Sequence, residues 1–108
     1  MDMRTPPQNL DAERSILGGL MVQPEAFEIV SEILGPKDFY KLVHQKIYQV
    51  ILELHNRRES IDIITVSNEL TTKKELEQIG GPSVLAEIMN EGPTAINIHQ
   101  YSKIVKEK

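Results

Sequence analysis

The sequence predicts an all-α domain, a compact globule of about six or seven short helices around a central helix at about 42–57. Three observations support this fold class. Apolar residues recur at intervals of three and four through most of the chain, no stretch alternates apolar and polar residues over the length of a strand, and proline and glycine pairs separate the periodic stretches. A length of 108 residues fits one domain with a single core.

The composition excludes several classes of function. The net charge of -4 gives no general positive field, so we do not expect the chain to hold DNA by itself. The absence of cysteine from the sequence excludes disulfides, thiolate metal sites and thiol nucleophiles. No signal-like N-terminus and no apolar run of about 18 residues is found, so we expect a cytoplasmic protein with no membrane contact.

The central helix is predicted from the longest periodic run in the chain. Its core-facing stripe consists of Val43, Ile47, Val50, Ile51 and Leu54. Tyr48 and Leu52 lie off this stripe, one turn apart, so the helix offers apolar surface in two directions. Neighbours within the chain are the simpler explanation of the second face, and a partner chain is the alternative.

The N-terminal part is predicted to consist of a flexible arm over 1–8 and then a helical domain over 9–108, because the first eight residues contain a proline pair and no periodicity. Asn9 is a suitable N-cap for the first helix. Gly18 and Gly19 lie inside this helix although glycine costs about 1 kcal/mol there relative to alanine. They predict close approach of another helix.

The second helix is bounded by proline and glycine. Pro24 suits its first position, and Gly35–Pro36 ends it. Phe39 and Tyr40 then lead into the central helix. We expect both aromatic rings to anchor this connection by filling gaps between helices.

Two short elements should follow the central helix. Asp62 is placed to cap a helix that carries Ile63, Val66 and Leu70 and that the pair Thr71–Thr72 breaks. A further turn over 74–79 is closed by two glycines, because glycine readily adopts the left-handed conformation that ends helices.

Two helices complete the predicted fold. Pro82 begins the first, and Gly92–Pro93 ends it. Asn97 and Gln100 stand at capping-box spacing, so the last helix is expected to begin after Asn97 and to run to Lys108. It has no C-terminal cap, as expected where a longer protein continues.

The sequence offers little for catalysis. It contains no phosphate-binding loop, and no serine stands in a nucleophile elbow. His44, His55 and His99 lack the spacing of metal ligands, and His44 is expected to bond a backbone carbonyl instead. We therefore predict no catalytic, cofactor-binding or metal-binding residue in this chain.

Two alternative functions remain open at this point. A small helix-turn-helix DNA-binding regulator would use 64–70 and 74–79 as its two helices, although Glu75 and Glu77 in the recognition position would be repelled by phosphates. A small enzyme would need paired carboxylates, for which the acidic stretch after residue 74, with Glu87 and Glu91, is the candidate. Solvated helix faces explain these carboxylates more simply.

The order of short segments strongly resembles the N-terminal domain of the bacterial replicative DNA helicase, the DnaB family. The resemblance extends from about Pro6 to Lys108 and rests on the series rather than on one motif. The segments are Pro6–Glu13, Ile16–Met21, Asp38–Tyr40, His44–Tyr48, Ile61–Thr65, Leu76–Gly81 and Pro93–Ile98. Ser60 replaces the proline usual in the family and Ile96 replaces a small residue, which concerns loop stiffness and local packing.

This resemblance implies a role in DNA replication. Helicases of the family are homohexamers in which a C-terminal RecA-like motor binds ATP and Mg and moves on single-stranded DNA. The N-terminal domains form a collar, commonly a trimer of dimers, which recruits the C-terminal domain of primase into the primosome. The motor and a helical hairpin would lie outside this chain. We therefore expect this chain to have no ATPase activity and to be a monomer or weak dimer.

Protein contacts need apolar anchors within a polar rim. Five residues are the candidates on this basis. They are Tyr48 and Leu52 off the core stripe, Asp11 and Arg14 on the exposed side of the first helix, and Val84 near the start of the helix that Pro82 begins.

Overall fold

The computed structural model describes residues 7–90 and 95–107, and within these ranges every regular element is helical. This confirms the predicted all-α class. The α-helices are α1 (Pro7–Val22), α2 (Phe27–Ser31), α3 (Leu42–Asn56), α4 (Ile63–Thr72), α5 (Pro82–Asn90) and α6 (Ala95–Lys106). Single 3₁₀ turns are η1 (Pro24–Ala26), η2 (Pro36–Asp38) and η3 (Glu77–Ile79).

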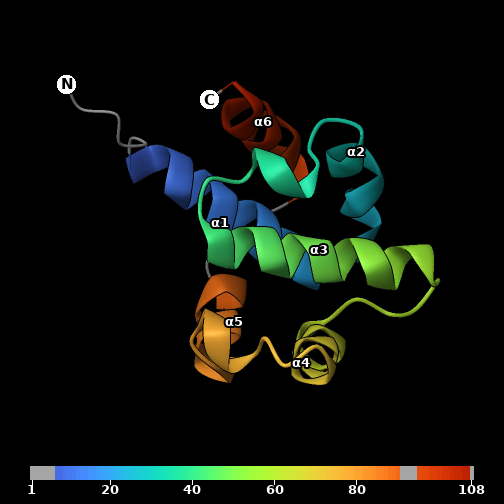
Figure 1. Cartoon of the computed structure of the whole chain (residues 1–108). Helices are drawn as coiled ribbons and strands as arrows, with labels where there is room; N and C mark the ends of the chain where they lie inside the picture. The colour runs from blue at the N-terminus through green and yellow to red at the C-terminus, as the bar shows by residue number, and fades with distance from the viewer. Residues whose placement is uncertain (1–6, 91–94, 108) are drawn as a thin grey trace.

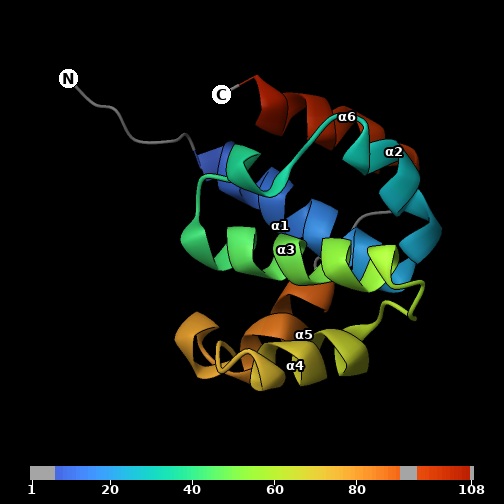
Figure 2. The same cartoon turned by 45° about the vertical axis from the view of Figure 1, so that its right-hand side comes forward.

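Two helices share the centre of the molecule. α1 and α3 lie side by side in the middle, with α2 and α6 on one side of them and α4 and α5 on the other (Figures 1 and 2). α1 packs against α3, α5 and α6, whereas α3 packs against α1 and α4. The prediction of one central helix is thus refined, because α1 packs against helices on both sides of the molecule and is as central as α3.

The core is formed by the predicted stripes of these two helices. In α3, Ile47, Val50, Ile51 and Leu54 are at most 1% exposed, and Val43 at the start of the stripe is half-buried. The stripe of α1 meets them with Ile16, Leu17, Leu20 and Met21. Since each fully buried aliphatic side chain contributes roughly 1.5–3 kcal/mol, these two stripes supply much of the free energy that holds the fold together.

The starts of α1 and α6 differ from the prediction. α1 begins at Pro7, so Asn9 lies inside the helix, and α6 begins at Ala95, so Asn97 also lies inside. Both predicted caps are wrong. A proline is well suited to the first turn of a helix and alanine is a strong helix former, so each helix extends past its expected cap. The rest of the predicted arm, residues 1–6, lies outside the described residues.

The glycine pair of α1 is buried. Gly18 and Gly19 both lie in the interior of this helix, which packs against α5 and α6. Close approach of another helix at these two glycines stays a prediction. The predicted stop of α5 at Gly92–Pro93 lies outside the described residues.

Three helical segments end by the same backbone device. A left-handed residue stands one or two positions after each end, with φ of 61° at Arg58 and Lys74 and 112° at Gly80. The next N–H then reaches back five residues, as in the 2.8 Å bond from the N–H of Glu75 to the carbonyl of Leu70. Gly80 was predicted to act in this way. α4 ends at Thr72, so the predicted break at Thr71–Thr72 is confirmed, and the left-handed Lys74 follows that end.

The segment between α1 and α3 differs from the prediction at the end of the second helix and at one aromatic residue. Pro24 opens η1, which continues into α2, but α2 ends at Ser31, so the predicted end at Gly35–Pro36 is wrong. Phe39 is 1% exposed and anchors the connection as expected. Tyr40 is 56% exposed, so its predicted gap-filling role is wrong; extended backbone at Phe39 points successive side chains to opposite sides.

Candidate protein-contact surface

The most buried polar contact joins α1 to the start of α3. Glu13 of α1 is 0% exposed and His44 of α3 is 1% exposed, with 2.7 Å between Oε1 of Glu13 and Nδ1 of His44. The carboxyl group also accepts hydrogen bonds from the backbone N–H groups of Tyr40 at 2.7 Å and Lys41 at 3.5 Å. Glu13 therefore satisfies backbone donors at the entry to α3, where the helix has no partners of its own for them.

This contact corrects the expectation for His44, whose partner is a carboxyl group and not a backbone carbonyl. Glu13 was not singled out from the sequence. The available signal is its position, since Leu10, Glu13 and Leu17 follow one helical face, and an acidic residue on an apolar face indicates a buried partner. The identity of that partner does not follow from the pattern.

Three of the five candidate contact residues lie close together. Asp11 and Arg14 form an ion pair on α1, with 65% and 30% of their side chains exposed. Arg14 and Val84 line one hollow of about 300 Å³, which also includes Glu87 of α5. The exposed side of α1 and the start of α5 therefore form one continuous candidate surface.

Tyr48 is a core residue, which corrects its assignment as a contact residue. It is 1% exposed and its hydroxyl donates a 2.8 Å hydrogen bond to the carbonyl of Leu34. Its ring lies between Phe27 and Phe39, at centroid distances of 5.7 and 4.9 Å. Burial raises the pKa of its hydroxyl, so the group stays protonated. Periodicity placed Tyr48 on a second face, and that face is covered by the chain itself.

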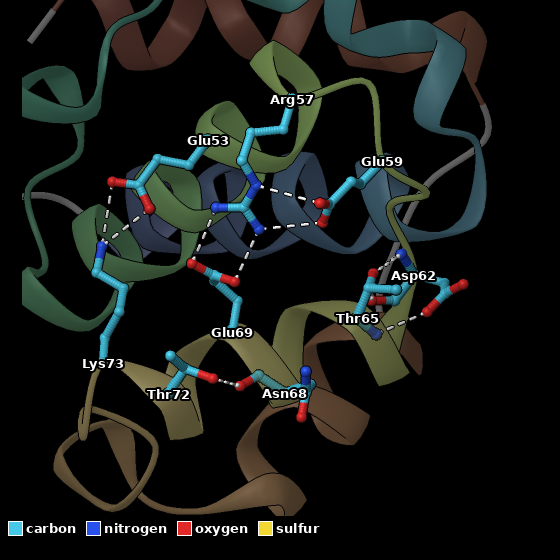
Figure 3. A network of polar contacts seen from close by, with 9 residues as sticks. All are labelled: Glu53, Arg57, Glu59, Asp62, Thr65, Asn68, Glu69, Thr72 and Lys73. Atoms are coloured by element: carbon cyan, nitrogen blue, oxygen red, sulfur yellow. Dashed lines mark hydrogen bonds and ion pairs between the residues drawn. The ribbon is translucent and has the colours of Figure 1, made fainter.

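Leu52, the other residue predicted on that face, is half-buried and packs against the edge of the core. Nearby, a ladder of exposed ion pairs joins α3 to α4 (Figure 3). Arg57 contacts Glu59 at 3.0 Å and Glu69 at 2.9 Å, and Lys73 contacts Glu53 at 3.1 Å. These pairs fix α4 against the C-terminal half of α3.

The ladder also changes the titration of its acids. The hydrogen bond from Arg57 lowers the pKa of Glu69. Hydrogen bonds from Gln49, and then from Lys73, lower the pKa of Glu53. Both acids are therefore ionised at neutral pH and become protonated only under acidic conditions.

The start of α4 is capped as predicted. The carboxylate of Asp62 accepts a 2.9 Å bond from the N–H of Thr65, and the hydroxyl of Thr65 accepts a 2.9 Å bond from the N–H of Asp62 (Figure 3). This reciprocal pair is a capping box.

The helix-turn-helix alternative does not fit this geometry. Its expected recognition helix over 74–79 is a single 3₁₀ turn of three residues, Glu77–Ile79. A recognition helix needs several turns to reach bases in the major groove. The alternative is therefore wrong for this segment.

The acidic residues after position 74 do not form an enzyme-like cluster. Glu75 pairs with Lys46 at 3.1 Å, and Glu77 and Glu87 are exposed on separate elements. Across residues 7–90 and 95–107, no group of three histidine, aspartate or glutamate side chains is arranged to hold a metal ion. Glu91 lies outside the described residues.

Comparisons with known proteins agree on one family. The DnaB-like helicase N-terminal domain family matches residues 5–107. The chain is 50% identical over 105 residues to the replicative DNA helicase DnaC of Bacillus subtilis and 45% identical to the replicative DNA helicase DnaB of Geobacillus stearothermophilus. Each alignment covers 97% of this chain but 23% of the relative, so the chain spans about a quarter of those helicases.

A solved structure supports the same assignment. The N-terminal domain of DnaB helicase from Mycobacterium tuberculosis superposes with a TM-score of 0.89 at 43% identity, covering 95% of this chain and 72% of that one. At this identity the likeness extends beyond the arrangement of helices to their sequence.

Proposed function

The chain belongs to the DnaB-like helicase N-terminal domain family, and we propose that it serves as the collar domain of a hexameric replicative DNA helicase. In this role it helps to assemble the subunits into a ring and docks the C-terminal domain of primase. The observation that carries the proposal is the family match over residues 5–107, together with 50% identity to a replicative helicase.

The chemistry of the chain supports an interaction role rather than a catalytic one. The 108 residues contain no phosphate-binding loop, and the described part holds no metal-binding cluster. We propose that ATP, Mg and single-stranded DNA are bound by a motor domain elsewhere in the longer protein. Unwinding would then be an activity of the complete ring.

We further propose that the chain acts in the cytoplasm, where bacterial chromosomes are replicated. Among the described residues, no helix has the length and hydropathy needed to cross a membrane. Asp11, Arg14, Leu52 and Val84 remain the proposed contact residues, with the first two and Val84 forming the continuous surface on α1 and α5.

The test of primase docking is a binding measurement between this chain and the C-terminal domain of the cognate primase. We expect the parent to bind, and Asp11→Lys to weaken binding at least about tenfold, because it reverses a charge on the candidate surface. Glu28→Lys makes the same reversal on α2 and should bind as the parent does. Failure of the parent to bind would contradict primase docking and leave ring assembly as the proposed role.

The assembly state of the chain alone is a separate test. In the described part of the chain, most large exposed apolar residues lie singly on α1, α2, α4 and α6, and only Tyr40 and Leu42 stand close together in the sequence. We therefore expect a monomer or weak dimer in sedimentation at micromolar concentration. A stable hexamer would contradict this expectation.

A further inference from the structure

One surface combines exposed apolar side chains with unpaired positive charge. Tyr40 and Leu42 are 56% and 62% exposed, and they stand only two positions apart at the start of α3. The other large apolar residues that are exposed in the described part of the chain lie singly on other elements. We name this region the 37–46 surface, and define it by Lys37, Tyr40, Lys41, Leu42, Gln45 and Lys46.

A groove adjoins Leu42 on this surface. It has a volume of about 530 Å³ and lies between η2, the first turns of α3 and the turn that follows α4. Pro36 and Leu42 give its wall apolar area, while Lys37 and Lys46 line it as well. An apolar side chain of a partner that enters the groove would contact Pro36 and Leu42.

The charge of the surface is opposite to that of the chain. Residues 37–46 contain three lysines and one aspartate, a net charge of +2 with His44 neutral, within a chain of net charge -4, so the remainder carries -6. Lys46 is paired with Glu75, and Asp38 approaches Lys106 at 3.4 Å. Lys37 and Lys41 are exposed and form no ion pair within the part of the chain that the structure describes.

The backbone under this surface is held in place from inside. The carboxyl group of Glu13 accepts hydrogen bonds from the N–H groups of Tyr40 and Lys41, and Gln45 donates a 2.7 Å bond to the carbonyl of Phe39. A surface that is fixed before binding loses less conformational entropy when a partner docks. Exposed apolar side chains on such a rigid segment therefore favour recognition.

We propose that the 37–46 surface docks an acidic segment of a partner protein that carries an apolar anchor. The anchor occupies the groove beside Leu42, and the carboxylates of the segment face Lys37 and Lys41. The 37–46 surface meets the candidate surface on α1 and α5 at Lys41, which also lines the hollow beside Arg14 and Val84. A protein segment fits better than nucleic acid, because Pro36 and Leu42 give the groove apolar area that an apolar side chain can cover.

The test uses the 108-residue chain and a fluorescein-labelled helical peptide with glutamate at its polar positions and two leucines one turn apart. Binding is followed by fluorescence anisotropy at about 50 mM salt, where charge attraction is only partly screened. One comparison peptide has lysine in place of every glutamate, and a second has alanine in place of both leucines. We expect binding of the acidic peptide and at least roughly tenfold weaker binding of both comparison peptides.

Two variants locate the site. Leu42→Glu removes the apolar contact at the first turn of α3, where an acidic residue suits the helix dipole, so the fold is retained. The double variant Lys37→Glu, Lys41→Glu reverses the free charges. We expect each to weaken binding at least about tenfold. The matched control is Ile64→Glu, which alters a residue 75% exposed on α4 and should change nothing.

Several results would overturn the proposal. They are absence of binding by the acidic peptide, equal binding of the lysine peptide, or an equal loss in Ile64→Glu. Competition by a single-stranded oligothymidine would assign the surface to nucleic acid instead. Helical circular dichroism of each variant equal to that of the parent ensures that a loss reflects the surface and not the fold.

Discussion

Two contacts between helices use an acid and a base in opposite environments. Glu13 and His44 join α1 to α3 with 0% and 2% of their side chains exposed, whereas Arg57 and Glu69 join α3 to α4 with 44% and 16% exposed. The carboxyl group of the buried acid also accepts hydrogen bonds from two backbone N–H groups. Stability should therefore be concentrated at the α1–α3 junction, while the exposed ladder adds a contribution that depends on solution conditions.

The largest effect should come from breaking the buried contact. Glu13→Ala leaves the side chain of His44, which is 1% exposed, and the N–H groups of Tyr40 and Lys41 without their acceptor. Removing one partner of a buried pair costs about 3–5 kcal/mol, and we expect a loss in that range in urea unfolding.

The control for this variant is Glu28→Ala, which removes an exposed acid on α2 and should change stability by less than about 0.5 kcal/mol. Glu13→Gln keeps one acceptor oxygen, so its stability should lie between those of Glu13→Ala and Glu28→Ala. Equal stabilities of Glu13→Ala and Glu28→Ala would show that the α1–α3 junction does not depend on this contact.

Removing the buried hydrogen bond of the Tyr48 hydroxyl should have the next largest effect on the free energy of unfolding. Tyr48→Phe removes the hydroxyl that donates to the carbonyl of Leu34 and keeps the ring between Phe27 and Phe39. Because the carbonyl is left without this donor, we expect a loss of about 1–2 kcal/mol in the same unfolding assay. Tyr101→Phe, on a half-buried residue of α6, is the matched control and should be nearly neutral.

Removing the partly exposed N-cap of α4 should cost less stability than removing either buried contact. Asp62→Ala removes the acceptor for the N–H of Thr65 and should destabilise the protein by about 1 kcal/mol. Asp62→Asn keeps an oxygen in the same place and should retain most of the stability. If both substitutions cost the same, the charge at the helix start matters more than the hydrogen bond.

The expected losses of stability follow how deeply each contact is buried. The sequence predicted some of the buried residues and missed others. The stripe of Ile47, Ile51 and Leu54 and the cap at Asp62 were predicted because helical periodicity and capping are local properties of the chain. The left-handed end at Gly80 was predicted for the same reason.

The features that the sequence did not reveal depend on distant contacts or on unfavourable local choices. Glu13 and His44 are 31 residues apart in the chain, so no local pattern pairs them. Tyr48 lies on a second helical face, and periodicity does not distinguish a second core face from an outward one. Arg58 and Lys74 adopt a left-handed conformation that glycine usually supplies, so the sequence predicted where α3 and α4 end but not this backbone conformation after each end.

The smallest expected effect is on the exposed ladder, and it should depend on pH. Arg57 lowers the pKa of Glu69 below its ordinary value of 4.5. A lowered pKa in the folded state contributes stability that is present above the unfolded value and is lost as pH falls through the folded value. Arg57→Ala should therefore be slightly less stable than the parent at pH 7, by less than Asp62→Ala, and the difference should shrink below a pH of about 4.5.

Arg58→Ala provides the matched control, because it removes the adjacent positive charge, which forms no ion pair in the part of the chain that the structure describes. Urea unfolding of the parent and both variants from neutral to acidic pH separates the ladder from the buried Glu13, which all three proteins retain. High salt should also reduce the difference for Arg57→Ala, since exposed pairs are screened. A difference that widens in acid, or one as large as that of Glu13→Ala, would mean that exposure does not set the strength of these contacts.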